Sequence, residues 1–404
     1  MSLITYVTRI HFADRVIEDA LAEELTGLRV TRPLVLTDAD TRGCGDLDRL
    51  VAALPGRAPQ VIRTDADQPL TLQAETVRAR AMADGCDGLL ALGGRAALDC
   101  ARLAGLPGPP VGKGAGACGL QKTLARAAVG TSRCERRRLP SILVPTLPGE
   151  GLGLSPALRL EPAGADDPAG SFMSDGLVPD LVLCDPTLGY DLPPERLAAS
   201  GFDALTHCIE AWLGTGWNPP ADGIALEGVR LAAGSLVRAV ETPDDIGARR
   251  ALLAAGLNAG LAAPKGLGAV HALAHALEAH PRTAGAAAMH GRYHAALIPH
   301  VLAFNAPAVP ERLALLGRAM GLEPGETPAD ALARLGDRLG LPRTLAGLDL
   351  PAGALEEVAR RAEADPSSRT NPRLACAADH ARMLSAAGAG KAAPTGCRKG
   401  MQPG

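Results

Sequence analysis

The sequence predicts an α/β domain followed by an all-α domain. Short runs of β-forming residues alternate with Ala- and Arg-rich stretches through the first 185 residues, which is typical of a parallel sheet covered by helices. After Asp185-Pro186 the strand signal ends, and Leu, Ala, Val and His recur at helical spacings to about Leu339. The 404 residues also exceed the roughly 250 to 300 at which a single core usually divides. We therefore expect domains at 1–187 and 188–387, followed by a disordered tail at 388–404.

The strands expected in the first domain are short runs rich in Leu, Val and Ile. They cover residues 33–37, 60–62, 88–92, 141–144 and 181–183. Ala- and Arg-rich stretches are predicted to form helices at 74–84 and 96–104. The Gly- and Pro-rich stretch 107–119 is expected to be a surface loop.

Composition excludes several kinds of partner. The net charge is −3, and neither Lys nor Arg gathers into a stripe that would bind nucleic acid or an anionic membrane. No apolar run reaches the length of about 18 residues that a membrane span needs, and the first residues do not resemble a signal peptide. The nine cysteines include no Cys-x-x-Cys pair, so neither a disulfide framework nor a zinc knuckle is indicated. We expect a cytoplasmic protein with a small-molecule partner.

The histidines are concentrated in the second domain, where seven of the nine lie between His207 and His300. Asp203 and His207 are four residues apart, which places a carboxylate and an imidazole on one face of a helix. His271 and His275 repeat this spacing, and His290 follows after a loop. Either pair alone could be a surface hydrogen bond or a pair of core histidines. Together they favour a metal site whose oxygen and nitrogen donors suit Fe(II) or Zn(II).

A glycine turn in the first domain is a candidate phosphate site. Gly93 and Gly94 follow an expected strand and precede an expected helix, so backbone N–H groups and the helix dipole could meet a pyrophosphate there. Many such turns only connect a strand to a helix. The turn therefore predicts a dinucleotide-binding domain only in combination with other features.

Several motifs together resemble the iron-containing alcohol dehydrogenase family. They keep their order along nearly the whole chain, and they are Cys184-Asp185-Pro186, Leu192-Pro193-Pro194, the run from Gly201 to Ala211, Asn218-Pro219-Pro220-Ala221-Asp222, the run from Gly266 to His275, Leu297-Ile298-Pro299-His300-Val301 and Thr370-Asn371-Pro372-Arg373. The resemblance implies an N-terminal dinucleotide-binding domain and a C-terminal metal-binding domain.

The resemblance also implies a set of metal ligands, namely Asp203, His207, His271 and His290. His275 should lie beside the metal without binding it, where it could relay a proton or be only a core histidine. The interval between His271 and His290 is longer than the family usually has, so His280 and His294 remain alternatives. Gly291 and the motif at 297–301 favour His290.

For the cofactor, the resemblance implies contacts from Gly93, Gly94, Arg95, Asp99 and Thr146. Arg95 stands where the family has a third glycine, and Ala96 follows where the family has a serine. The stretch 145–153 replaces a loop rich in Thr, Gly and Ser. Both departures change the groups that can contact phosphate.

Asp38 follows the expected strand 33–37 and matches an acidic position of the family. Its carboxylate could accept hydrogen bonds from the adenosine ribose and repel a 2′-phosphate, so we expect NAD(H) to be preferred over NADP(H). Alternatively, Asp38 is only a turn former.

The expected activity is metal-dependent hydride transfer between a nicotinamide cofactor and a short alcohol or aldehyde. The resemblance is greatest to members whose substrates have an acidic far end, of the 4-hydroxybutyrate or phosphonoacetaldehyde type, and Lys265 and Arg282 could bind such an anion. A homo-oligomer, in particular a dimer, is expected. Two alternatives are a metal-dependent lyase of the dehydroquinate synthase kind and a nonenzymatic descendant with weakened cofactor binding.

Overall fold

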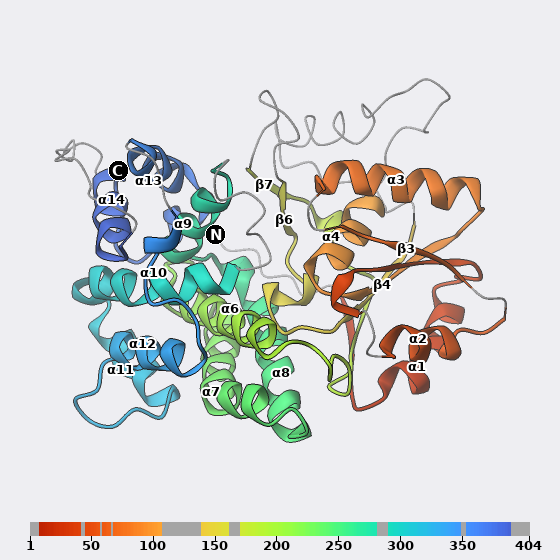
Figure 1. Ribbon diagram of the computed structural model, residues 1–404, viewed down its shortest axis with the longest axis horizontal. Coiled ribbons are helices and arrows are strands. Elements are labelled where there is room, and N and C mark those ends of the chain that lie inside the picture. The colour runs from red at the N-terminus through yellow and green to blue at the C-terminus, as the bar shows by residue number, and fades with distance from the viewer. Residues whose placement is uncertain are drawn as a thin grey trace.

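The computed structural model describes residues 8–41, 45–56, 59–65, 68–106, 139–160, 170–280, 290–348 and 353–388. An α/β part lies beside a helical part (Figure 1), so the predicted fold class is confirmed. The expected domain boundary at 187/188 falls between strand β8 (Leu181–Cys184) and helix α6 (Pro194–Leu213), and its position stays a prediction. The expected surface loop 107–119 and the tail after residue 388 lie outside the described residues.

The main sheet is six-stranded and parallel, with the order β1-β8-β5-β4-β2-β3. Besides β8, its strands are β1 (Arg9–Phe12), β2 (Pro33–Thr37), β3 (Gln60–Arg63), β4 (Gly88–Gly93) and β5 (Ser141–Pro145). The sequence did not predict β1, a four-residue strand. Its partner β8 lies about 170 residues further along, for example at the pair Arg9 and Leu181, so no local pattern marks the pairing.

Helices cover both faces of this sheet because neighbouring residues of each strand point to opposite faces. Leu34 and Leu36 of β2 belong to the core beneath α3 (Leu70–Ala83) and α4 (Arg95–Ala104). Val35 between them belongs to the core beneath α1 (Val16–Gly27) and α2 (Asp46–Ala53). Figure 1 shows these two helix pairs on opposite sides of the strands. The expected helices 74–84 and 96–104 correspond to α3 and α4.

A two-stranded antiparallel sheet lies beside α4 and was not predicted. It consists of β6 (Ala157–Leu160) and β7 (Gly170–Met173). Arg102 of α4 binds the backbone carbonyls of Ser155 and Ala157, which fixes the start of β6.

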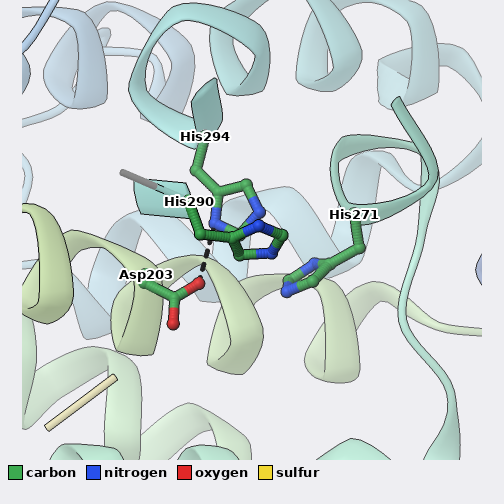
Figure 2. Close-up of side chains that lie close together, drawn as sticks. All are labelled: Asp203, His271, His290 and His294. Atoms are coloured by element: carbon green, nitrogen blue, oxygen red, sulfur yellow. Dashed lines mark ion pairs between the residues drawn. The ribbon is translucent and has the colours of Figure 1, made fainter. Parts of the chain in front are cut away.

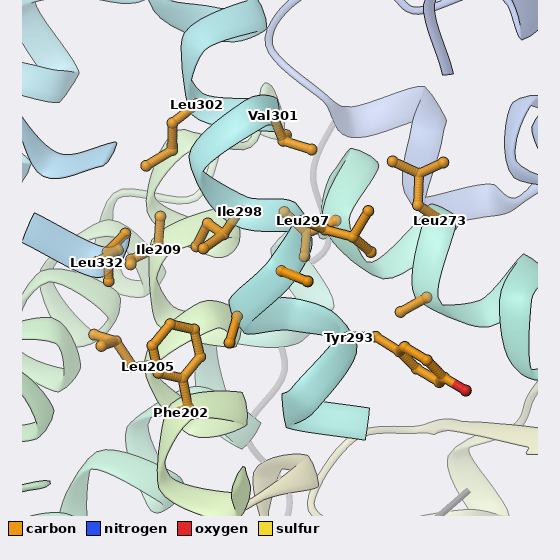
Figure 3. Close-up of a cluster of buried hydrophobic side chains, with 14 of the residues drawn as sticks. Phe202, Leu205, Ile209, Leu273, Tyr293, Leu297, Ile298, Val301, Leu302 and Leu332 are labelled. Atoms are coloured by element: carbon orange, nitrogen blue, oxygen red, sulfur yellow. The ribbon is translucent and has the colours of Figure 1, made fainter. Parts of the chain in front are cut away.

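The helical part surrounds an extensive core made mainly of Ala, Leu and Val. After α6, its α-helices are α7 (Pro219–Glu241), α8 (Ile246–Ala262), α9 (Ala269–Glu278), α10 (His290–Asn305), α11 (Pro310–Ala319), α12 (Pro328–Arg338), α13 (Ala354–Ala364) and α14 (Ala377–Ala386). Local capping explains several starts: Asn218, Asp245 and Thr327 each accept a hydrogen bond from a backbone N–H three residues later. Figure 3 shows the contacts among α6, α9 and α10 that fix the site described below.

None of the described helices combines the length and low polarity required to cross a bilayer. The thiols of Cys86, Cys100, Cys184 and Cys208 are free. Cys376 is disulfide-bonded, which the cysteine spacing did not predict.

The segment 146–153 joins the two parts of the molecule. The Gly149 N–H donates to Ser200 Oγ of α6 over 2.7 Å. A Cβ at Gly256 of α8 would overlap the Pro148 carbonyl oxygen, and one at Gly260 would overlap the Gly151 carbonyl oxygen. Glycines on α8 therefore allow the segment to lie directly against the helix backbone.

We expect Gly260→Ala to destabilise the protein, because the added methyl group must displace backbone rather than a flexible side chain. Overpacking of this kind costs about 1 to 3 kcal/mol. Thermal unfolding should show a lower Tm for this variant. Gly234→Ala on α7 is the matched control, since it lies on an exposed face where a Cβ meets nothing within 4 Å. Its Tm should be equal or higher. Equal Tm values for Gly260→Ala and the wild type would contradict the expectation.

Candidate metal centre

Helix α6 supplies the first two candidate ligands. Asp203 and His207 lie one turn apart on its buried face, and His207 Nδ1 is 3.3 Å from Asp203 Oδ1. All residues from Gly201 to Leu213 are buried. A buried carboxylate destabilises the folded state unless charged or polar groups face it. We therefore expect Asp203 to have partners on neighbouring helices.

Helices α9 and α10 supply those partners. His271 lies on α9, whereas His290 and His294 lie one turn apart at the start of α10. A Cβ at Gly291 would overlap the Ala199 carbonyl oxygen of α6. The His-Gly pair therefore allows the start of α10 to lie against α6, which brings both of its histidines to Asp203.

Ligand atoms of Asp203, His271, His290 and His294 all lie within 4.8 Å of one another (Figure 2). His207 borders this cluster, and its Nε2 is 3.1 Å from His271 Nε2. All five side chains are buried. The structure thus brings together three of the four ligands expected from the sequence, Asp203, His271 and His290, and places the fourth, His207, at the edge of their cluster. It adds His294, which the sequence left as an alternative to His290.

Two buried carboxylates hold the Nδ1 atoms of His271 and His290. Glu210 Oε2 lies 2.6 Å from His271 Nδ1, and Glu278 Oε1 lies 2.5 Å from His290 Nδ1. Each carboxylate fixes the orientation of its imidazole and leaves Nε2 available, an arrangement common around metal-binding histidines. Sequence reasoning missed both glutamates. The signal was a charged residue inside an otherwise apolar helical run, three residues after His207 or His275.

The environment sets the protonation of the cluster. Burial alone would raise the pKa of Asp203, but the His207 and His294 imidazoles lower it well below its usual range. Burial lowers the pKa of His271, His290 and His294, that of His294 to about 4. The imidazoles are therefore neutral at pH 7, which is the form that binds metal ions.

The carboxylates beyond the cluster differ in their electrostatics. Burial raises the pKa of Glu210 to about 7, although hydrogen bonds from three backbone N–H groups act in the opposite direction. Burial also opposes the ionisation of Glu278, but His290 and Arg159 lower its pKa to about 2. Arg159 Nη1 is 2.9 Å from Glu278 Oε2. Neutral imidazoles and buried carboxylate oxygens form a donor set that fits a first-row divalent ion.

His275 lies beside the cluster but is not one of its members among the described residues. Its ring centroid is 5.5 Å from that of His290, with the two rings stacked. Nδ1 is 2.9 Å from Asp365 Oδ2. Burial alone would raise the pKa of Asp365, but the hydrogen bond with His275 lowers it to about 2. An ionised carboxylate can only accept, so Nδ1 carries the proton and Nε2 can accept one.

The other candidate residues of the helical part lie apart from this cluster. The Lys265 ammonium is buried and binds the Ala211 and Trp212 carbonyls and, over 2.5 Å, Asp222 Oδ1. These bonds close the end of α6 and speak against a role in binding substrate. His280 is buried outside the cluster. Arg282 lies outside the described residues.

The glycine turn of the α/β part leads into the N-terminus of α4. Gly94 is the N-cap of this helix and has no side chain with which to cap it. Gly93 has a φ of +146°, which favours glycine. The Gly94 N–H donates to Asp38 Oδ2 over 2.8 Å. Asp38 therefore shapes the turn and lies at the carboxyl end of β2, the end of the strands at which open α/β sheets generally bind ligands.

The remaining cofactor candidates occupy different positions around this turn. Arg95 and Arg102 both pair with Asp99, at 3.5 Å and 2.5 Å, so Asp99 stabilises α4. The Thr146 N–H donates to the Gly93 carbonyl. Its buried Oγ1 has no hydrogen-bond partner, which leaves a hydroxyl beside the glycine turn for a ligand.

A parallel sheet with a glycine turn at the start of a helix, in a molecule that also has a buried Asp and His cluster, is the arrangement of a metal- and nicotinamide-dependent oxidoreductase. Residues 8–186 match the iron-containing alcohol dehydrogenase family, and residues 197–388 match the C-terminal domain of the Fe-containing alcohol dehydrogenase family. The chain belongs to this family, and it is an enzyme that uses a metal ion and NAD(H).

Individual relatives agree with this placement. A 4-hydroxybutyrate dehydrogenase from Cupriavidus necator is 34% identical over 95% of this chain and 99% of that protein. Long-chain-alcohol dehydrogenase 1 from Geobacillus thermodenitrificans is 30% identical over 85% of this chain and 86% of its own. The crystal structure of a 1,3-propanediol oxidoreductase superposes with a TM-score of 0.82 at 25% identity, covering 96% of this chain and 100% of its own.

Proposed function

We propose that this enzyme interconverts a short alcohol and its aldehyde when the substrate carries an acidic group at its far end, as in 4-hydroxybutyrate and succinic semialdehyde or in phosphonoacetaldehyde. The similarity to a 4-hydroxybutyrate dehydrogenase over almost the full length of both chains carries this proposal. Neutral short alcohols are the alternative substrates.

Asp203, His207, His271 and His290 are the residues that would hold the metal, and Fe(II) is the ion we propose, with Zn(II) as the alternative. When bound, the ion would act as a Lewis acid on the substrate oxygen while the nicotinamide exchanges hydride with the carbon. Glu210 and Glu278 keep two of the imidazoles oriented toward the cluster. His275 relays the proton in the reductive direction: while its Nδ1–H stays bonded to Asp365, Nε2 takes up a proton and then passes it to the substrate oxygen.

The substrate proposal is tested by following NADH oxidation with succinic semialdehyde, phosphonoacetaldehyde and butanal, with the metal content measured on the same sample. One charge-assisted hydrogen bond to the acidic end should raise kcat/KM at least about tenfold over butanal. Arg282→Ala should remove most of that difference, whereas Lys265→Met should mainly lower the Tm because it removes the buried ammonium that pairs with Asp222. Equal or faster turnover of butanal by the wild type would overturn the proposal.

The preference for NAD(H) over NADP(H) is proposed to depend on the Asp38 carboxylate. Asp38→Asn should raise the relative kcat/KM with NADP(H), because the charge that repels a 2′-phosphate is removed while an oxygen remains to accept from the Gly94 N–H. Asp38→Gly should give the same change but also loosen the turn, which would raise KM for both cofactors. A wild type that already prefers NADP(H), or an unchanged ratio in both variants, would assign cofactor choice to another residue.

Two further properties are proposed from the sequence. We place the enzyme in the cytoplasm and assign it a homodimeric state. Light scattering of the purified protein tests the second, and cell fractionation tests the first.

A further inference from the structure

His294 is the side chain of the cluster that the proposed ligand set does not use. It is fully buried on α10, one turn after His290. Its Nδ1 lies 3.0 Å from Asp203 Oδ1 (Figure 2), yet neither ring nitrogen makes a hydrogen bond of acceptable geometry. A buried imidazole in this state loses its hydration without full compensation. A histidine at this position is therefore unfavourable unless its ring nitrogens bind a partner that the protein itself does not supply.

The side chains around His294 indicate that this partner is a metal ion. Asp203 lies between two imidazoles, with His207 Nδ1 at 3.3 Å and His294 Nδ1 at 3.0 Å from the same oxygen. Ligand atoms of His294, His271, His290 and Asp203 lie within 4.8 Å of one another. Two ligands of one ion lie at most about 4.2 Å apart, which is twice a typical bond length of about 2.1 Å. A closure of a few tenths of an ångström therefore places the ligand atoms of these four residues around one ion, and His207 Nε2 lies beside them, 3.1 Å from His271 Nε2.

We propose that His294 is a fifth protein donor to the metal, in addition to Asp203, His207, His271 and His290. This inference rests on the proposed function of the cluster. Five donors exceed the tetrahedral number that Zn(II) prefers, and they suit a six-coordinate ion with one position left for a substrate oxygen. The fifth donor therefore favours an ion such as Fe(II) or Co(II) at this site.

The test compares His294→Leu with His300→Leu in the full-length protein. His300 lies on the same helix, outside the cluster. The proteins are stripped with a chelator and titrated with Co(II) alone, and both the affinity and the visible absorption of the bound ion are measured. Loss of a residue that only orients a metal ligand weakens metal binding about 10- to 100-fold, and loss of a ligand itself should weaken Co(II) binding at least as much. The absorption should also intensify, because Co(II) absorbs more strongly at lower coordination number. His300→Leu should match the wild type.

Stability of the metal-free proteins separates a ligand from a core histidine. If His294 is retained for the metal, metal-free His294→Leu should unfold at a Tm no lower than the metal-free wild type, while its stabilisation by Co(II) shrinks. If His294→Leu does not fold, His294→Gln provides the same comparison.

Unchanged affinity and absorption in the His294 variant would overturn the fifth donor. His271→Ala is measured alongside. Loss of Co(II) binding in that variant would support the four-ligand site even if His294 is not a donor. If His271→Ala also binds Co(II) like the wild type, the proposed metal site itself is wrong.

Discussion

Replacing His271 by alanine should lower kcat/KM by at least about 100-fold and remove most of the bound metal. His271 is almost fully buried, with an exposed fraction of 1%, and its Nε2 faces the centre of the cluster, 3.1 Å from His207 Nε2. A metal ion that stabilises charge on the reacting oxygen supplies several kcal/mol, and each 1.36 kcal/mol is a factor of ten in rate. Steady-state kinetics and elemental analysis of the same preparation measure both effects.

His275→Asn is the matched control for this prediction. It lies on the same helix, one turn later, and its ring is held by Asp365 outside the cluster. We expect this variant to retain the metal while kcat falls, because the substitution removes the proposed proton relay but none of the proposed metal ligands. Full activity of the His271 variant, or of the wild type after complete removal of metal, would reject metal-dependent catalysis.

Glu210→Ala should produce the second large effect, on stability as well as on metal affinity. The Glu210 carboxylate accepts hydrogen bonds from the backbone N–H groups of Gly268, Val270 and His271, and it holds the His271 ring. Its removal leaves buried donors without an acceptor, at a cost of about 3 to 5 kcal/mol. Loss of such a partner of a metal-binding imidazole lowers metal affinity about 10- to 100-fold.

Thermal unfolding and metal titration of three variants test the role of Glu210. Glu210→Gln should be intermediate, because its amide keeps one acceptor but directs an NH₂ group toward donors. Glu227→Ala, on the exposed face of α7, should stay within about 0.5 kcal/mol of the wild type. If Glu210→Ala were as stable and as metal-rich as Glu227→Ala, the buried carboxylate would not be what positions His271.

Local patterns predicted elements whose signal is contained within a few residues. The strand 33–37 agrees with β2, and the helix 96–104 differs from α4 by one residue at its start. The same local periodicity predicted that Asp203 and His207 share a helix face. β1 and the β6–β7 pair were missed because a four-residue strand carries little pattern of its own and becomes a strand only by pairing with residues far along the chain.

The sequence by itself therefore identified the candidate residues and the glycine turn, since residue type and spacing along one helix or one turn contain that information. The choice of Asp203, His207, His271 and His290 as the expected ligands came from the resemblance to the family. Only the tertiary structure decided which residues of different helices meet. It added His294 to the cluster and paired Lys265 with Asp222. It also placed the carboxylates of Glu210 and Glu278 within hydrogen-bonding distance of the Nδ1 atoms of two histidines. These outcomes depend on the distance between helices, which is fixed by backbone contacts such as that of Gly291 with Ala199, and no spacing within a single helix contains that distance.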